Sequence, residues 1–105
     1  MAAINLNEKE FKDNLQAGKV MLVDYWAPWC GYCRRIAPAY EKIAQEQGDK
    51  LLIAKVNIDE APLVAAAENI EVIPTLVLYR DGQAIASIVA PESKAAIDAF
   101  IQENL

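Results

Sequence analysis

The two cysteines of this 105-residue chain, Cys30 and Cys33, are separated by two residues. A thiol pair at this spacing serves either to exchange disulfides or to bind a metal. Two cysteines are too few for the disulfide framework of a small secreted domain, and a reducing cytosol would not keep a purely structural bridge closed. Because a tetrahedral zinc site needs about four ligands and the chain has no histidine, we expect no metal and favour disulfide exchange.

The composition excludes several other classes of protein. With 54% hydrophobic and 24% charged residues the chain is typical of a soluble globular protein, and its length fits a single domain over residues 1–105. A net charge of -5, with no basic cluster beyond Arg34-Arg35, excludes nucleic acid as a partner. The first residues lack the pattern of a secretory signal, and no apolar stretch is long enough to cross a membrane. We therefore expect a cytoplasmic monomer with no membrane partner.

Hydrophobic periodicity and turn residues predict strands and helices in the order β-α-β-α-β-α-β-β-α. The expected strands cover residues 3–6, 20–26, 51–57, 75–80 and 83–89, and the expected helices cover residues 8–17, 34–47 and 63–68, with a last helix capped by Ser93. This order indicates an α/β fold, a three-layer α/β/α sandwich. Its central sheet is mixed, parallel at first and antiparallel at its hairpin end.

Local signals support these boundaries. Asn7 and Glu10 are spaced as in a capping box at the start of the first helix. Asp81-Gly82, between two strand patterns, is a specific signal for a tight hairpin turn. Pro38 lies inside the second predicted helix and is expected to kink it, because proline has no N–H to donate to the preceding turn. We treat Pro38 as a structural residue.

The segment 20–26 is nearly continuous in apolar and β-favouring residues, which predicts a central strand buried on both faces. Its single charged residue, Asp24, is then buried as well. A buried carboxylate is costly unless it is neutral, paired or useful in chemistry. The cysteine pair follows this strand directly, at the carboxyl edge of the sheet, where the sites of α/β proteins collect.

Cys30 is placed to be the reactive thiol. The start of the second helix, with Arg34 one turn further on, favours the thiolate form that attacks disulfides. Cys33 comes within reach of Cys30 and is expected to be more buried, which suits a resolving thiol. These placements predict that Cys30 attacks a substrate disulfide and forms a mixed disulfide with the substrate. Cys33 then attacks this mixed disulfide, which releases the reduced substrate and leaves a Cys30-Cys33 disulfide.

With these residues laid out, the chain from about Asn7 to Leu105 resembles the thioredoxin family. The matching segments are Val23-Asp24-Tyr25-Trp26-Ala27-Pro28-Trp29-Cys30-Gly31 with Cys33, Ile36-Ala37-Pro38, Ala54-Lys55-Val56-Asn57-Ile58-Asp59, Ile73-Pro74-Thr75-Leu76 and Asp81-Gly82. A chance Cys-x-x-Cys would bring none of the other four segments. The resemblance implies a protein-disulfide reductase with no bound cofactor, whose redox-active group is the Cys30-Cys33 disulfide. It also implies, as partners, disulfide-containing client proteins and a thioredoxin reductase linked to NADPH or ferredoxin.

The resemblance assigns roles to further residues. It implies that Asp24, with Lys55 beside it, assists proton loss from Cys33; a structurally satisfied carboxylate is the alternative. It also implies a cis peptide bond between Ile73 and Pro74 that faces the dithiol. There the backbone of Ile73 pairs with an extended substrate, as an added strand would.

Aromatic and small residues near the dithiol complete the candidate site. Trp26 is expected to serve mainly in packing. Trp29, beside Cys30 near an exposed rim, offers a flat apolar contact to a protein substrate. Gly31 and Tyr32, between the cysteines, are expected to take part in substrate binding.

Two positions depart from the family pattern. Members usually have Gly-Pro between the cysteines, whereas this chain has Gly31-Tyr32. Loss of the proline restores an N–H in the first helical turn and gives a less rigid loop, so we expect a more stable thiolate. The expected reduction potential lies between about −270 mV and about −180 mV, the values of thioredoxin and protein disulfide isomerase. Ala90 stands where members generally have a glycine that contacts substrate, so we expect less space for a substrate backbone and a restricted set of clients.

Other functions stay open on the sequence alone. A more oxidising potential would favour a disulfide isomerase or oxidase. Tyr32 also matches the Cys-Pro-Tyr-Cys of glutaredoxins, which makes a glutathione-dependent activity a minority alternative. In a further alternative the fold is a non-catalytic binding subunit whose thiols are incidental.

Overall fold

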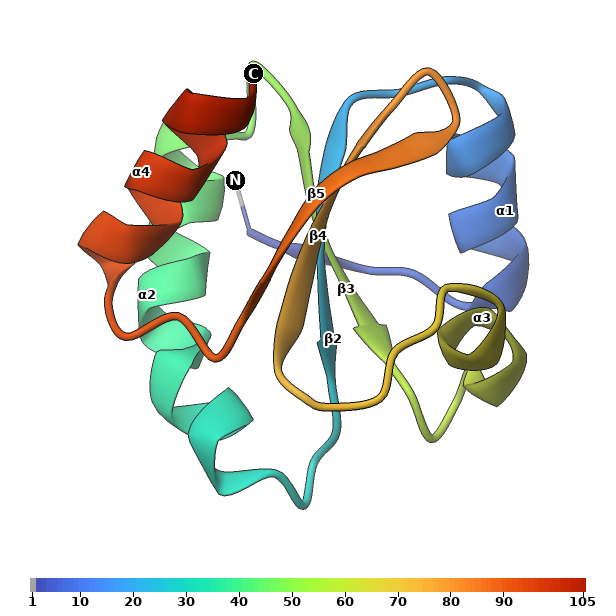
Figure 1. Ribbon diagram of the computed structural model, residues 1–105, viewed down its shortest axis with the longest axis horizontal. Coiled ribbons are helices and arrows are strands. Elements are labelled where there is room, and N and C mark those ends of the chain that lie inside the picture. The colour runs from blue at the N-terminus through green and yellow to red at the C-terminus, as the bar shows by residue number, and fades with distance from the viewer. Residues whose placement is uncertain (1) are drawn as a thin grey trace.

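The computed structural model describes residues 2–105 and contains the strands and helices in the predicted order (Figure 1). The strands are β1 (Ile4–Asn5), β2 (Met21–Trp26), β3 (Leu52–Asn57), β4 (Thr75–Arg80) and β5 (Gln83–Val89). The helices are α1 (Glu8–Gln16), α2 (Gly31–Gln47), α3 (Pro62–Ala67) and α4 (Lys94–Asn104). The hairpin strands β4 and β5 have the predicted bounds.

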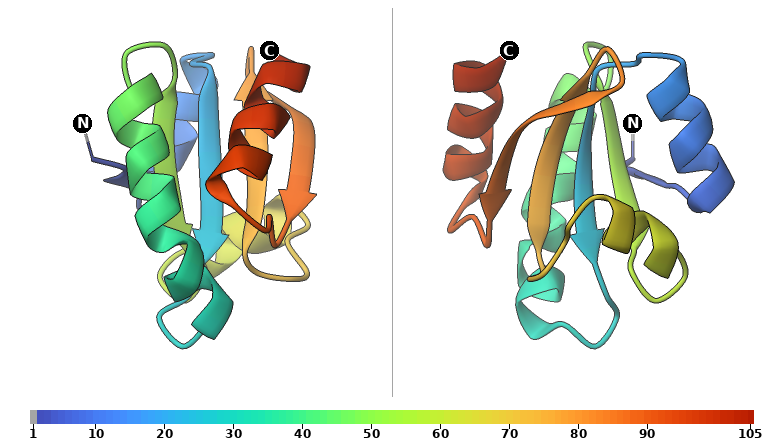
Figure 2. Two further views of the ribbon diagram at one scale, coloured as in Figure 1. Left: turned by 90° about the vertical axis from the view of Figure 1, so that its left-hand side faces the viewer. Right: turned by 45° about the vertical axis from the view of Figure 1, so that its right-hand side comes forward.

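The strands form one mixed sheet in the order β1-β3-β2-β4-β5. β2 is central, as predicted, and it is parallel to β3 and antiparallel to β4. Helices α1 and α3 cover one face of the sheet and α2 and α4 cover the other, so the predicted three layers are confirmed (Figures 1 and 2). The parallel half of the sheet brings the carboxyl ends of β2 and β3 to the same edge.

Local signals in the sequence account for the ends of several elements. The Asn7 side chain accepts a hydrogen bond from the Glu10 N–H at 2.8 Å, and the Glu10 carboxylate accepts one from the Asn7 N–H at 3.0 Å. This is the predicted capping box. Asp81 and Gly82 have φ angles of 55° and 79°, as a two-residue type I′ hairpin turn requires. Ser93 caps α4, as predicted.

Two predicted boundaries need correction. β1 has 2 residues, fewer than expected: the Ala3 N–H donates to the Glu41 carboxylate at 3.0 Å, whereas the Leu6 N–H still donates to the Lys55 carbonyl of β3 at 2.9 Å. α2 begins at Gly31, before the apolar pattern that predicts it, because Cys30 caps its first turn. α2 then runs through Pro38 without a break, and its axis bends between the first turns and the rest (Figure 2).

The sheet separates two apolar cores, and β2 contributes to both. Leu22 packs with residues of α2 and α4, whereas Met21, Val23 and Tyr25 pack with residues of α1 and α3. Because side chains alternate along a strand, Asp24 points to the same face as Leu22, under α2. Asp24 is 1% exposed, so the predicted burial of this carboxylate is confirmed.

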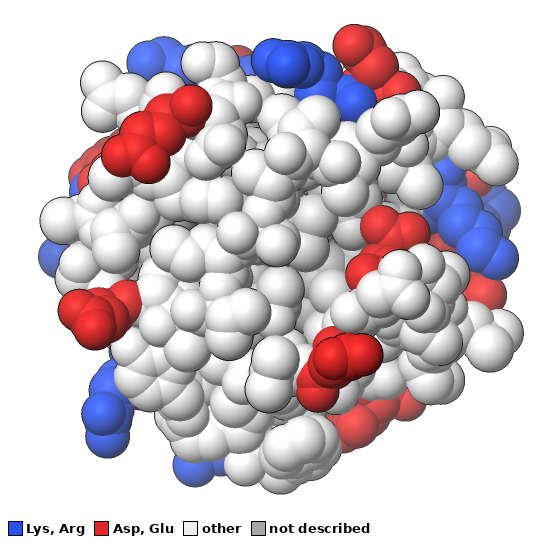
Figure 3. Space-filling model, viewed as in Figure 1, with Lys and Arg blue, Asp and Glu red and all other residues white. Residues whose placement is uncertain are grey.

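The face of the molecule seen in Figure 1 is largely uncharged at its centre. β5 crosses this face at one edge of the sheet, and its 7 residues carry no charge. Acidic and basic side chains lie mainly around the margin of the same view (Figure 3). This face has no basic patch that would hold a nucleic-acid backbone. Within residues 2–105, no helix has the length and apolar character needed to span a membrane.

Candidate active site

Cys30 and Cys33 are joined by a disulfide at the start of α2, with their Cα atoms 5.3 Å apart. Cys30 is the N-cap residue, and its Sγ accepts a hydrogen bond from the Cys33 N–H at 3.2 Å. Amides of a first helical turn have no partner within the helix, so they stabilise a thiolate at this position. Cys30 is 9% exposed and Cys33 is 3% exposed, which confirms that Cys33 is the more buried of the two.

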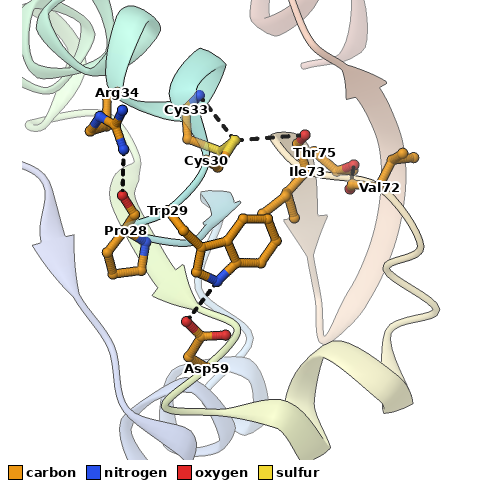
Figure 4. The surroundings of a disulfide bond; sticks show 9 residues. All are labelled: Pro28, Trp29, Cys30, Cys33, Arg34, Asp59, Val72, Ile73 and Thr75. Atoms are coloured by element: carbon orange, nitrogen blue, oxygen red, sulfur yellow. Dashed lines mark hydrogen bonds between the residues drawn. A yellow bond between two sulfur atoms is a disulfide. The ribbon is translucent and has the colours of Figure 1, made fainter.

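Ile73 lies opposite the disulfide, in the loop before β4 (Figure 4). The peptide bond between Ile73 and Pro74 is cis, as predicted. The carbonyl oxygen of Ile73 is 3.9 Å from Cys30 Sγ. In the disulfide state this sulfur carries no proton, so the two atoms are in contact only, whereas a reduced thiol at this place has a proton to donate. The backbone of Ile73 is therefore directly beside the sulfur.

Asp24 and Lys55 are neighbours on adjacent strands, because the register of β2 and β3 pairs their Cα positions. Burial raises the pKa of Asp24 from 3.8 to about 7, and the positive charge of Lys55 opposes part of that rise. Lys55 Nζ also lies 4.4 Å from the centre of the Trp26 ring, a cation–π contact. Within residues 2–105, Asp24 Oδ1 and Trp26 Nε1 are buried without a hydrogen-bond partner.

Trp29 extends from the rim beside Cys30, and 65% of the residue is exposed. Its indole N–H donates to Asp59 Oδ2 at 2.9 Å, which fixes the direction of the ring (Figure 4). Sequence reasoning missed this role of Asp59. Its position just after β3, at the same edge of the sheet as the cysteines, is the signal that points to it.

Three further residues of α2, Arg34, Gly31 and Pro38, make no hydrogen bond to either sulfur of the disulfide within the part of the chain that the structure describes. Arg34 Nη1 donates to the Pro28 carbonyl at 2.7 Å, on the loop before Cys30 (Figure 4). The Arg34 guanidinium is thus held on the loop that precedes Cys30, and the hydrogen bond to the sulfur comes from the Cys33 amide. Gly31 is exposed, with open space where a side chain would lie. Pro38 is exposed further along α2 and is not part of the site.

The Tyr32 side chain reaches from α2 to the loop after β5. Its hydroxyl donates to the Pro91 carbonyl at 2.9 Å, and its half-buried ring packs on the core under α2. Ala90, next to Pro91, has a φ of 46°, and its N–H donates to the Pro74 carbonyl at 2.9 Å. The Tyr32–Pro91 hydrogen bond is a contact that proline could not make, and it opposes the expected gain in flexibility at position 32.

Ala90→Gly is expected to stabilise the protein by about 1 kcal/mol, because a left-handed backbone is unfavourable for a residue with a Cβ and not for glycine. Urea unfolding measures the difference. The matched control is Ala84→Gly in β5, which is expected to destabilise by about 0.5 to 1 kcal/mol, since glycine gains nothing within a strand. Equal destabilisation by both changes would contradict this prediction. Ala90→Gly also tests the expected restriction of clients: unchanged reduction rates for several protein disulfides would remove that expectation.

The surroundings of the disulfide define a class of protein. One sulfur, that of Cys30, accepts an amide hydrogen bond at the start of a helix, and the second sulfur is bonded to it and more deeply buried. The backbone of Ile73 lies beside the first sulfur. Such a pair belongs to the thiol–disulfide oxidoreductases.

Comparison with known proteins identifies the family. The Thioredoxin family model matches residues 2–103. The thioredoxin of Acidithiobacillus ferridurans is 43% identical over 99% of this chain and 97% of its own length, and that of Staphylococcus saprophyticus is 38% identical over the full length of both. A solved mutant thioredoxin from Halobacterium salinarum matches with a TM-score of 0.86 at 28% identity, over 98% of this chain and 90% of that one. The chain belongs to the thioredoxin family.

Membership of this family confirms the predicted fold and the predicted class of activity. The protein is a protein-disulfide oxidoreductase. The glutaredoxin-like, isomerase and non-catalytic alternatives are not favoured, because the matched relatives are thioredoxins and the cysteine pair is joined as a disulfide. Within residues 2–105, no group of three or more His, Cys, Asp or Glu side chains is arranged to hold a metal ion.

Proposed function

We propose that the protein reduces disulfides in client proteins, with Cys30 as the nucleophile and Cys33 as the resolving thiol. The observation that carries this proposal is the position of Cys30 Sγ, which accepts the Cys33 N–H and lies against the backbone of Ile73. A thiolate is therefore favoured at the place where a client disulfide arrives.

The proposed reaction moves two electrons from the dithiol to the client. The Cys30 thiolate attacks one sulfur of the client disulfide and expels the other as a thiolate, which forms a mixed disulfide. The Cys33 thiol then loses its proton and attacks Cys30 Sγ. This second attack expels the remaining client sulfur as a thiolate and leaves the Cys30-Cys33 disulfide.

Asp24 is the proposed acceptor of the Cys33 proton. Its carboxyl group lies under α2 on the face of the sheet that this helix covers. With a pKa of about 7 it is partly ionised at neutral pH, so it can take up a proton and return it to solvent. Lys55 is the proposed partner of Asp24, since its charge lowers the pKa of the buried carboxyl and keeps part of it ionised.

Client binding is proposed at a surface around the disulfide that we call the client rim. The backbone of Ile73 pairs with an extended client segment, and the exposed ring of Trp29 packs against it. The other residues of the client rim are Gly31, Tyr32, Pro74 and Ala90. Trp26 and Pro38 serve structural roles.

We further propose that residues 1–105 act as a single domain, as a cytoplasmic monomer without a bound cofactor. The match of relatives over their whole length supports one domain. A thioredoxin reductase linked to NADPH or ferredoxin would restore the dithiol after each turnover. The relatives are named thioredoxins, which supports a partner of this kind.

Insulin reduction tests the proposed function and identifies the reductase. The protein is incubated with insulin and either an NADPH-linked or a ferredoxin-linked thioredoxin reductase, and new insulin thiols are counted over time. We expect turnover with one of the two. Absence of catalysis with both enzymes, and with dithiothreitol as the reductant, would remove the proposal.

The reduction potential is expected to lie between about −270 mV and about −180 mV. Tyr32 in place of proline adds an N–H to the first turn of α2, and this donor favours the Cys30 thiolate in the reduced state. Equilibration with glutathione buffers of known ratio measures the potential. The matched control, Tyr32→Pro, is expected to be more reducing. A wild-type value at or below about −270 mV would contradict the prediction.

A further inference from the structure

The two sides of the client rim touch at two places, the second of them at Pro91, which follows Ala90 of the rim. One side is the start of α2, and the other is formed by the loop before β4 and the loop after β5. The sides meet first where Cys30 Sγ lies 3.9 Å from the Ile73 carbonyl oxygen. They meet again where the Tyr32 hydroxyl donates to the Pro91 carbonyl at 2.9 Å. A client segment that extends along Ile73 toward Pro91 therefore meets a closed end.

Tyr32 is held in place by more than this hydrogen bond. Its ring packs on the apolar core under α2, and the guanidinium carbon of Arg35 lies 5.8 Å from the ring centre. Pro91, which accepts the bond, is buried. Because both partners are already restricted by packing, the hydrogen bond forms with little further loss of side-chain entropy.

Ala90 connects this contact to the cis-proline loop. Its N–H donates to the Pro74 carbonyl at 2.9 Å, and its φ of 46° lies in the left-handed region. A residue with a Cβ keeps such a backbone conformation only where its surroundings hold it. Here the Ala90 to Pro74 bond holds the loop on one side and the Tyr32 to Pro91 bond holds it on the other.

We propose that the Tyr32–Pro91 hydrogen bond closes one end of the client rim and makes Tyr32 a specificity-determining residue. This inference rests on the proposed function and names its preferred substrates. They are small disulfides, and disulfides near a chain end, whose flanking residues leave the site before Pro91. A disulfide inside a long extended segment binds only after the Tyr32–Pro91 bond breaks, so it is reduced less efficiently.

The test compares two disulfides in wild type and in Tyr32→Phe, which removes the hydroxyl and keeps the ring. One substrate is bis(2-hydroxyethyl) disulfide, and the other is the symmetric disulfide of an extended nine-residue peptide with a central cysteine. The readout is the kcat/KM of the peptide divided by that of the small disulfide. We expect this ratio to rise about 3- to 10-fold in Tyr32→Phe, the effect of losing one neutral hydrogen bond. A change in thiol reactivity alone would move both substrates together and leave the ratio unchanged.

Amide hydrogen exchange gives a second readout that does not depend on turnover. The Ala90 N–H exchanges when the loop after β5 opens, so its exchange rate is expected to rise by a similar factor in Tyr32→Phe. Tyr25→Phe is the matched control, because its hydroxyl contacts Tyr79 at 2.6 Å on the other face of the sheet. It is expected to leave both readouts as in wild type.

The outcomes separate the inference from the function on which it rests. A higher ratio together with faster Ala90 exchange supports the closed end. An unchanged or lower ratio overturns it, even if exchange is faster, because the contact then does not select substrates. If wild type reduces neither disulfide, the proposed function fails and the inference fails with it.

Discussion

Cys33→Ser is expected to accumulate as a mixed disulfide with its clients, in which Cys30 is joined to a client cysteine. The first attack needs only the Cys30 thiolate, which the start of α2 stabilises. The second attack needs a thiol at position 33, and serine cannot supply one. The adduct is expected at one client per protein, measured as a mass shift that dithiothreitol reverses.

Cys30→Ser is the matched variant and is expected to behave differently. Without the more accessible of the two cysteines as nucleophile, insulin reduction should fall by about 10³-fold or more, the scale on which the loss of a covalent nucleophile slows enzymes. No stable client adduct is expected, because Cys33 is only 3% exposed. An adduct formed by Cys30→Ser and not by Cys33→Ser would show that the two roles are reversed.

Asp24→Asn is expected to stabilise the oxidised protein by a few kcal/mol above neutral pH and by almost nothing near pH 4. Burial raises the pKa of Asp24 from 3.8 to about 7 in the folded state, so the folded protein binds this proton more tightly than the unfolded chain does. The stability contributed by the protonated carboxyl is complete below about pH 4 and is lost as the pH rises through 7. A shift of this size corresponds to at most about 4 kcal/mol. The side-chain amide of asparagine stays neutral at every pH, so the variant does not lose this stability as the pH rises.

Denaturant unfolding of wild type and Asp24→Asn between pH 4 and pH 9 measures this effect. Asp49→Asn serves as the control, because Asp49 is an exposed carboxylate in the loop after α2, and its curve should follow that of wild type. Wild type and Asp24→Asn should have equal stability at the acid end and separate steadily toward pH 8. Curves that run parallel over the whole range would show that Asp24 titrates normally in the folded protein.

Most of the fold could be predicted because it depends on short-range patterns. The β4–β5 hairpin follows from two strand patterns joined by Asp81-Gly82, the residue types that a type I′ turn needs. The burial of Asp24 follows from its place as the only charge in a continuous apolar run. In both cases neighbours in the sequence decide the outcome.

The contacts that sequence reasoning missed join residues that are far apart in the chain. Trp29 and Asp59 are 30 residues apart, and Tyr32 and Pro91 are 59 apart. Which acceptor an indole or hydroxyl group reaches depends on where loops from different strands meet at the edge of the sheet. Arg34 shows the same limit at short range, since its side chain donates to the Pro28 carbonyl, a contact that the sequence pattern does not reveal.

The uncharged strand β5 has a consequence for the handling of concentrated solutions. Edge strands are usually protected from pairing with other molecules by charged residues or proline, and β5 has neither. At neutral pH the net charge of -5 makes whole molecules repel one another, which opposes contact between two such edges. This repulsion is expected to disappear near pH 4.6, the isoelectric point that the amino-acid composition implies. We therefore expect the acid limit for storage to be set by association of folded molecules through β5 rather than by unfolding.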